Sequence, residues 1–237
     1  DINDAINKAG RQRMLSQRMG KAWLALAHRA DTPTARQVLE QSIALFERQL
    51  GELKAYAPTA LIRDTYVQLE AAWGAHKAAL QTQELTADRA SVLLQADAKV
   101  LALAHQGTVQ YEAASGKPVG QLVNIAGRQR MLSQRMAKFY LAAMLPVDAA
   151  AAKEEITKAR AEFVAATERL RSAPQATQRI RQELQLADSQ WVFFDAALQR
   201  MQGGGNVNRQ VAEVYVASEN LLASMDRVTG MYAALAA

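Results

Sequence analysis

Arginine, glycine and methionine follow one another in the same order at two places in this sequence of 237 residues. The segment Ala9-Gly-Arg-Gln-Arg-Met-Leu-Ser-Gln-Arg-Met19 recurs unchanged from Ala126 to Met136, at an offset of 117 residues. A guanidinium group presents a planar fork of donors, which matches planar oxyanions such as nitrate, nitrite and carboxylate. The repeated segment therefore predicts a site that binds a small oxyanion.

Each copy places four candidate ligand-binding residues along one stripe of a helix, because successive residues turn by about 100°. They are Gly10, Arg13, Met14 and Gln17 in the first copy and Gly127, Arg130, Met131 and Gln134 in the second. Glycine inside a helix costs about 0.5–1 kcal/mol relative to alanine. We therefore expect another helix or a ligand to approach the backbone closely at the two glycines.

Arg13 and Arg130 are the pair expected to hold the anion. If the two stripes face one another, the guanidinium groups repel by about 3 kcal/mol at a separation of about 6 Å and an effective dielectric of about 20. A small anion between them would turn this repulsion into attraction. We expect twin unneutralised cations that converge on one pocket; the alternative is that each arginine simply pairs with an acidic side chain of a neighbouring helix.

The repeat extends far beyond the arginine segment, so the sequence predicts two copies of one domain, at residues 1–116 and 117–237. The offset drifts slowly, as small insertions would cause. It is 117 for Phe46 and Phe163, 118 for Trp73 and Trp191, and 121 for Leu101 and Leu222, Thr108 and Thr229, and Tyr111 and Tyr232.

Loop-forming residues divide each copy into four helical stretches. We expect helices over 2–30, 34–56, 60–82 and 88–114, and over 119–145, 149–172, 176–201 and 207–235. The breaks are Asp31 to Pro33, Pro58, Thr86 to Asp88, Ser115 to Pro118, Pro146, Pro174 and Gly203 to Gly205.

Apolar residues recur at spacings of three and four residues within these stretches, so one face of each helix is apolar and should pack into a hydrophobic core. The fold class is all-α, and four helices with short connections predict an up-down-up-down bundle. Two tandem four-helix bundles would lie side by side as an intramolecular pseudo-dimer, with their first helices facing each other. End-to-end stacking is the alternative.

The composition argues against several other functions. The net charge is +5, but the basic residues gather inside the repeated segments and not along a continuous face, so nucleic acid is not an expected partner. The chain has no cysteine, and His28, His76 and His105 lack partners at metal-ligand spacing. We see no acid–base constellation and expect neither a metal, nor a cofactor, nor enzymatic activity. No run approaches the roughly 20 apolar residues of a membrane span.

The segments Asn7 to Met19 and Asn124 to Met136 closely resemble the signature of the PilJ-type domain, the N-terminal domain of type IV pili methyl-accepting chemotaxis transducers. They are also similar to the periplasmic P-box of nitrate/nitrite sensor kinases, in which a Gly-x-x-Arg-Met core opens the first helix of a four-helix bundle. The resemblance covers each whole copy in helix pattern and is specific over residues 7–19 and 124–136.

The resemblance implies that one arginine from each half grips nitrate, here Arg13 and Arg130. It implies structural pairing for Arg18 and Arg135, which match a second arginine of the P-box. This chain departs from the kinases because both copies stand in one polypeptide and because Arg-Gln replaces a less charged pair. The departure bears on the identity of the ligand more than on the position of the site.

The function predicted from these features is a periplasmic sensor protein that binds nitrate by preference, and nitrite next, between the two repeated segments. The first residue, Asp1, is not an initiator methionine, which suggests a processed secreted protein or an excised ectodomain. The partners are a small inorganic oxyanion and, by resemblance, a membrane-bound signalling protein. The alternative is a helical protein–protein interaction module of a signalling or pilus/chemotaxis system, with no small ligand.

Overall fold

All the regular structure in the computed structural model is helical over the residues that it describes, 1–30, 32–145, 149–200 and 206–235. The first copy holds α1 (Ile2–His28), α2 (Thr32–Tyr56), α3 (Ala60–Leu80) and α4 (Ala87–Ser115). The second copy holds α5 (Pro118–Ala143), α6 (Ala149–Ser172), α7 (Gln178–Gln199) and α8 (Val207–Ala233). The predicted all-α fold class is confirmed. No helix in these ranges is long and apolar enough to cross a membrane.

The helix ends lie within two residues of the predicted ones, and threonine caps fix three of the helix starts. Thr59, Thr86 and Thr177 each accept a hydrogen bond from the backbone N–H three residues later. The predicted loop that included Pro33 is wrong at that residue, since α2 begins at Thr32. A proline in the first turn removes only an N–H that has no helical partner. The breaks predicted at Asp31, Pro146 and Gly203 to Gly205 lie outside the described residues.

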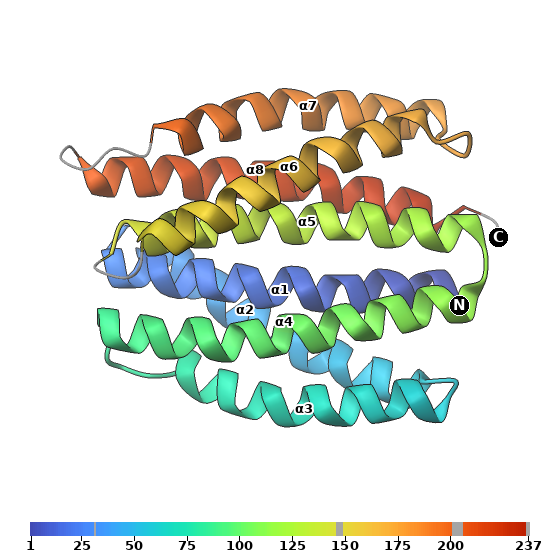
Figure 1. Cartoon of the computed structure of the whole chain (residues 1–237), viewed down its shortest axis with the longest axis horizontal. Coiled ribbons are helices and arrows are strands. Elements are labelled where there is room, and N and C mark those ends of the chain that lie inside the picture. Colours follow the sequence, from blue (N-terminus) through green and yellow to red (C-terminus); the bar gives the residue numbers. More distant parts are fainter. Residues whose placement is uncertain (31, 146–148, 201–205, 236–237) are drawn as a thin grey trace.

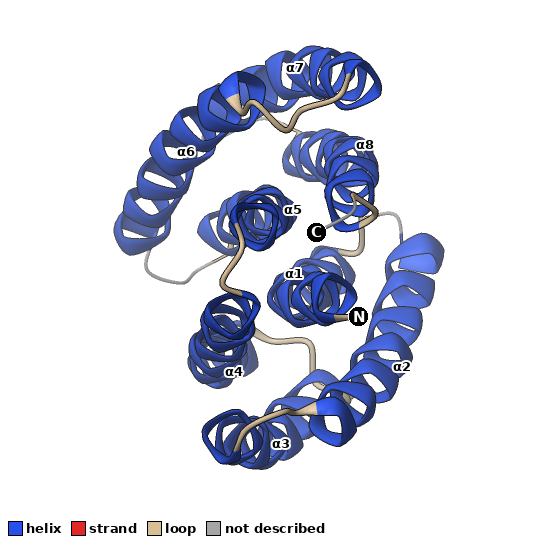
Figure 2. Ribbon diagram, turned by 90° about the vertical axis from the view of Figure 1, so that its right-hand side faces the viewer, coloured by secondary structure: helices blue, strands red, loops and turns tan. Residues whose placement is uncertain are grey.

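The two first helices, α1 and α5, lie side by side at the centre of the molecule and run in the same direction (Figure 1). α4 packs on α1, α8 packs on α5, and each of these two helices also contacts the first helix of the other copy. The remaining pairs, α2 with α3 and α6 with α7, form two outer arcs related by an approximate twofold axis (Figure 2). The copies are therefore side by side, as predicted, and not stacked end to end.

Two equivalent tyrosines make the same contact in the two copies. Tyr111 donates its hydroxyl to the carbonyl oxygen of Leu53 at 2.7 Å, and Tyr232 donates to that of Leu170 at 3.1 Å. Both hydroxyls are buried and tie the last helix of a copy to its second helix. The repeat in the sequence is thus a repeat of specific tertiary contacts.

A contact between two aromatic rings also repeats on the outer arcs. The rings of Phe46 and Trp73 are 4.3 Å apart between centroids, and those of Phe163 and Trp191 are 4.6 Å apart. Such pairs contribute about 0.5–1.5 kcal/mol beyond the area that they bury. They hold each outer pair of helices together above a hydrophobic core that both copies share.

Replacing either tyrosine by phenylalanine tests the equivalence of the two copies. Tyr111→Phe and Tyr232→Phe each remove one buried hydrogen bond to a backbone carbonyl oxygen, so we expect each to lower the free energy of unfolding by about 1 kcal/mol. The two losses should add in the double variant, because α4 and α8 lie on opposite sides of the central helices α1 and α5 (Figure 2). Urea denaturation followed by circular dichroism measures them. A large loss in one copy beside none in the other would contradict the equivalence.

Candidate functional site

The two glycines of the repeated segments lie beside the arginines of both copies, where α1 meets α5. A methyl group at Gly10 would lie 3.0 Å from Nη2 of Arg13 and 3.4 Å from Nη2 of Arg130. A methyl group at Gly127 would lie 3.0 Å from Nη2 of Arg130 and 3.7 Å from Nη2 of Arg13. Both guanidinium groups therefore lie against both glycines, which explains why a residue with no side chain stands in the middle of α1 and α5.

Arg13 and Arg130 are buried completely, each with 0% of its surface exposed. The positions of their Nη2 atoms beside Gly10 place them within about 6 Å of one another, where like charges repel by about 3 kcal/mol at an effective dielectric of about 20. The predicted meeting of the two arginines is thus present in the structure. Whether the site can bind an anion depends on the groups that balance each of these charges.

Each arginine donates to the backbone of the opposite copy. Nη2 of Arg13 donates to the carbonyl oxygen of Asn124 at 3.2 Å, and Nη2 of Arg130 donates to that of Asn7 at 3.1 Å. These reciprocal bonds cross the contact between α1 and α5. The two side chains therefore link the two copies directly.

The contacts of the Nη1 atoms differ between the two arginines. Nη1 of Arg130 donates to Asp226 at 2.8 Å and to the side chain of Asn7 at 2.9 Å. Nη1 of Arg13 lies 3.0 Å from Nδ1 of His105, and Nε of Arg13 has no hydrogen-bond partner. The expectation of twin unneutralised cations is therefore wrong for Arg130, which has a carboxylate partner.

His105 and Asp226 stand at equivalent positions of the two copies, because the offset of 121 residues relates them. Each is flanked by two arginines, one from α1 and one from α5. His105 contacts Arg13 and Arg128, whereas Asp226 contacts Arg130 and, at 3.9 Å, Arg11. One copy thus holds an anion where the other holds an imidazole.

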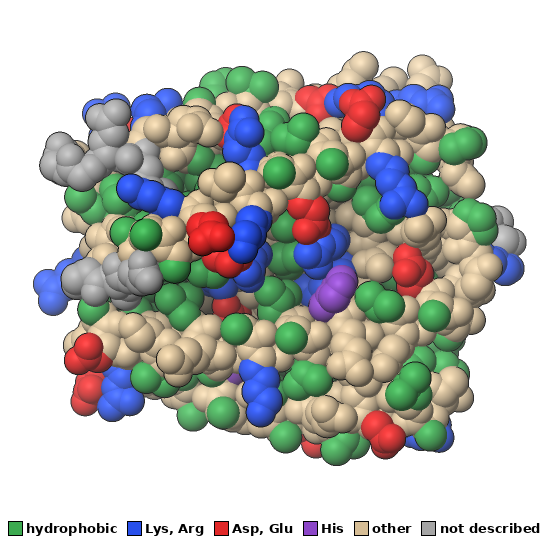
Figure 3. Space-filling view, in the orientation of Figure 1, with side chains coloured by type: hydrophobic (Ala, Val, Ile, Leu, Met, Phe, Trp, Pro, Cys, Tyr) green, Lys and Arg blue, Asp and Glu red, His purple; other side chains and the backbone are tan. Residues whose placement is uncertain are grey.

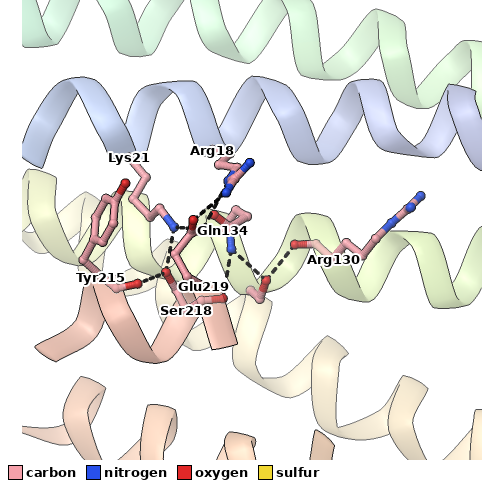
Figure 4. Close-up of polar contacts among 8 residues, drawn as sticks. Arg18, Lys21, Arg130, Gln134, Tyr215, Ser218 and Glu219 are labelled. Carbon is pink, nitrogen blue, oxygen red and sulfur yellow. Dashed lines mark hydrogen bonds and ion pairs between the residues drawn. The ribbon is translucent and has the colours of Figure 1, made fainter. Parts of the chain in front are cut away.

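One turn further along α5, a polar network connects the arginine site to α8 (Figure 4). Ser133 donates to the carbonyl oxygen of Arg130, Gln134 donates to Ser133, and Gln134 also donates to the carbonyl oxygen of Ser218 at 3.2 Å. Lys21 from α1 donates to the hydroxyl of Ser218 at 2.8 Å. The network therefore joins α1, α5 and α8.

The carboxylate of this network belongs to Glu219, which accepts from both Lys21 and Arg18. Burial alone would raise the pKa of Glu219, but Lys21 and Arg18 outweigh burial and hold it at about 2. Burial lowers the pKa of Lys21 to about 8 against the attraction of Glu219. The pair therefore stays ionised at pH 7.

The equivalent network of the first copy joins α1, α4 and α5. Ser16 donates to the carbonyl oxygen of Arg13, and Gln17 donates to Ser16 and, at 2.7 Å, to Asp97. Lys138 from α5 pairs with the same carboxylate, and both members of this pair are buried. Each first helix thus extends a lysine to the last helix of the other copy.

Burial acts strongly on the groups at the centre. Together with the nearby charges of Arg128 and Arg130, it lowers the pKa of Arg13 to about 9, and it lowers that of Arg130 to about 10 although Asp226 opposes the shift. Both arginines carry their charge at pH 7. Burial, Arg13 and Arg128 lower the pKa of His105 to about 4, so its ring is neutral at pH 7.

A groove of about 380 Å³ opens beside His105, between α4, α5 and α6. Its charged lining consists of Arg128, Arg135, Lys158, Glu155 and Glu162. Basic and acidic side chains gather around one histidine on this face of the molecule (Figure 3). The ring of His105 therefore separates the groove from the buried Arg13.

The predicted site residues fall into two groups. Gly10, Arg13, Gly127 and Arg130 meet at the contact between the copies. The amide nitrogens of Gln17 and Gln134 are used by the networks one turn away.

The methionines and the second arginines lie around this centre. Met14 and Met131 are buried, and Met131 also lines the groove. Arg18 pairs with Glu219 and Arg135 with Glu155, which agrees with the structural pairing predicted for them.

Sequence reasoning missed His105, Asp226, Asp97 and Glu219. The offset of 121 residues, which aligns Tyr111 with Tyr232, also aligns His105 with Asp226, and this signal was present in the sequence. Over the described parts of the chain, no group of three or more His, Asp and Glu residues could hold a metal ion.

The fold and the site together define a class, the tandem helical bundles that bury a cationic site at the junction of their two copies. A family model described as "Type IV pili methyl-accepting chemotaxis transducer N-term", PilJ, matches residues 2–102 and 111–228. The chain belongs to this family of signalling-transducer domains, which is not a known enzyme family. No curated protein and no solved structure gave a match.

The buried pair of Lys138 and Asp97 is predicted to be essential for stability. Asp97→Ala should lower the free energy of unfolding by about 3–5 kcal/mol, because it leaves a buried ammonium group without its carboxylate. Replacing both members by apolar residues, as in Asp97→Leu with Lys138→Met, should restore most of this loss. Urea denaturation measures both. A double variant no more stable than the single one would show that the loss has another cause.

Stability is predicted to fall as the pH is lowered from about 6.5 to about 4. Burial lowers the pKa of both His76 and His105 to about 4, from an ordinary value of 6.5. The unfolded chain therefore binds protons in this range that the folded chain does not, and folding loses free energy. The melting temperature should drop between pH 7 and pH 5.

The control for this pH dependence is His76→Phe, which keeps an aromatic ring against Trp73 and cannot take up a proton. Its melting temperature should drop less than that of the unchanged protein over the same range. Curves that run parallel would refute the assignment to His76.

Proposed function

We propose that this protein is a sensor domain that binds a small planar oxyanion, nitrate by preference and nitrite next, between Arg13 and Arg130. The proposal goes beyond membership of the PilJ family, which establishes a domain of chemotaxis or pilus transducers. It is supported by the charge balance of the site, by the geometry of its donors and by the resemblance of the repeated segment to the P-box.

The partners of the buried cations are the main support for the proposal. Among the described residues, four cationic side chains are buried: Arg13, Lys21, Arg130 and Lys138. Three of them have a carboxylate partner, namely Glu219, Asp226 and Asp97. Arg13 contacts a neutral imidazole instead, so its charge is not paired directly. A buried cation without an anion costs several kcal/mol, which a bound anion would offset.

The donors fit a planar anion better than a spherical one. Arg13 offers Nε, which has no partner, together with Nη1, whose present acceptor is uncharged. Nη2, which donates only to the uncharged carbonyl oxygen of Asn124, lies beside Nε on one edge of the rigid, flat guanidinium and beside Nη1 on another. Two parallel N–H···O bonds from either edge suit two oxygens of one planar group. Arg130 lies within about 6 Å and adds a second positive charge to the same place.

Binding would be transmitted through the contact between α1 and α5. Ser16 and Ser133 bond to the carbonyl oxygens of Arg13 and Arg130, and the networks behind them reach α4 and α8. An anion that draws the two arginines together would therefore shift α1 against α5 and carry α4 and α8 with them. The size of this shift is limited by the difference in anion affinity between the two arrangements.

We also propose that the domain acts in the periplasm and passes its signal to a membrane-bound partner. This part of the proposal rests on the family and on the resemblance to the periplasmic P-box. The family is named for transducers of chemotaxis signals, and the P-box that the repeated segments resemble is periplasmic.

Calorimetric titration with nitrate, nitrite and chloride tests the proposal. Nitrate should bind more tightly than nitrite, and chloride should bind weakest, because it cannot accept two parallel hydrogen bonds. Arg13→Met and Arg130→Met should each lower the affinity for nitrate at least about tenfold, since one charged hydrogen bond contributes about 1.5–3 kcal/mol. Methionine fills most of the space of the arginine, so the fold should persist.

The matched control is Arg48→Met, which removes an exposed guanidinium paired only with Glu52 on the surface of α2. Its affinity for nitrate should equal that of the unchanged protein. A ligand of the native state must also raise the melting temperature. Unchanged nitrate affinity in both arginine variants would disprove the proposal, and no effect of any anion on melting would favour an interaction module.

A further inference from the structure

The ring of His105 is held in one protonation state by its neighbours. Its Nδ1 lies 3.0 Å from Nη1 of Arg13 and 3.3 Å from Nη1 of Arg128. Arginine only donates, so Nδ1 must accept from both and the ring hydrogen must be on Nε2. A single lone pair thus serves two cations, which is a weak substitute for an anion.

Asp226 provides the anion at the equivalent place of the second copy. Its carboxylate accepts from Nη1 of Arg130 and also lies 3.9 Å from Arg11. The carboxylate is 48% exposed, so it closes that side of the site at the surface of the molecule. An incoming anion on that side would meet a negative charge.

The side of His105 differs because it opens into the groove between α4, α5 and α6. Glu162 in this groove forms a bidentate pair with Arg128, and no hydrogen bond or ion pair joins it to Arg13. The groove presents three cations, Arg128, Arg135 and Lys158, against two carboxylates. Each of these cations forms an ion pair with a carboxylate, Lys158 with Glu154 beside the groove. Arg13, behind the ring of His105, has no such partner, and its charge draws anions toward the ring.

We infer that the anion reaches Arg13 from this side alone, through the groove beside His105, and that Asp226 acts as a fixed internal anion that closes the opposite side. The bound anion replaces the His105 ring as the acceptor of Arg13 Nη1. His105 is thus a positioning residue whose lack of charge keeps one of two equivalent sides open. The inference rests on the proposed function, because it concerns the route and the place of the same anion.

An exchange of residue types between the two sides tests this asymmetry by calorimetry with nitrate. His105→Asp places a carboxylate beside Arg13, and it should lower the affinity for nitrate at least about tenfold while raising the melting temperature. Asp226→Asn removes the internal anion and should leave the affinity equal or increase it. If His105→Asp binds nitrate as tightly as the unchanged protein, the inference is overturned.

A second pair of variants tests the route without changing the site. Ala102 lines the groove, and Ala223, 121 residues later, is its exposed equivalent on the side of Asp226. Ala102→Trp should slow the exchange of nitrate about tenfold, whereas Ala223→Trp should not. Line broadening in the NMR spectrum of ¹⁵N-labelled nitrate measures these rates. The route would be overturned if Ala223→Trp slowed the exchange of nitrate, or if neither variant slowed it.

Arg13→Met separates this inference from the proposed function. If Arg13→Met abolishes nitrate binding while the His105 and Ala102 variants behave as the unchanged protein does, that result supports the anion site and contradicts the one-sided route. If Arg13→Met and Arg130→Met both bind nitrate normally, the proposed function itself falls.

Discussion

The contact between two buried guanidinium groups and two glycines is the constraint on which this structure depends. Arg13 and Arg130 can approach only because Gly10 and Gly127 leave their helices bare where α1 and α5 meet. Each guanidinium then donates to a backbone carbonyl of the other copy. The like charges repel by about 3 kcal/mol. Each buried guanidinium therefore either has an anionic partner within the protein or carries an unpaired charge.

The two copies balance the charge of their central arginine differently, and this difference makes the two sides of the site unequal. Most repeated residues make repeated contacts, as the tyrosine hydroxyls and the aromatic pairs do. The position that faces each central arginine does not, because it is Asp226 in one copy and His105 in the other. A symmetric homodimer could not make this distinction, since every substitution would occur twice. The tandem arrangement within one chain allows one side to be neutralised permanently and the other to be left to a ligand.

Much of the architecture could be predicted because the repeat and the capping residues are local signals. Thr59, Thr86 and Thr177 mark helix starts, and the short connections determine that neighbouring helices run antiparallel. The meeting of Arg13 with Arg130 followed from the glycine stripe. The partners of these arginines could not be found by spacing within a helix, since His105 and Asp226 lie about ninety residues further along the chain. Charge balance is a property of packing between helices, and only the alignment of the two copies could have indicated it.

The most direct measurement of the central claim is a crystal structure of the protein with nitrate at saturating concentration. The account predicts planar density for one anion against Nε or Nη1 of Arg13, with the ring of His105 displaced from its present contact and Asp226 still bound to Arg130. Density that shows Arg13 bound to His105 as it is now, with no anion within hydrogen-bonding distance of either central arginine, would contradict the account.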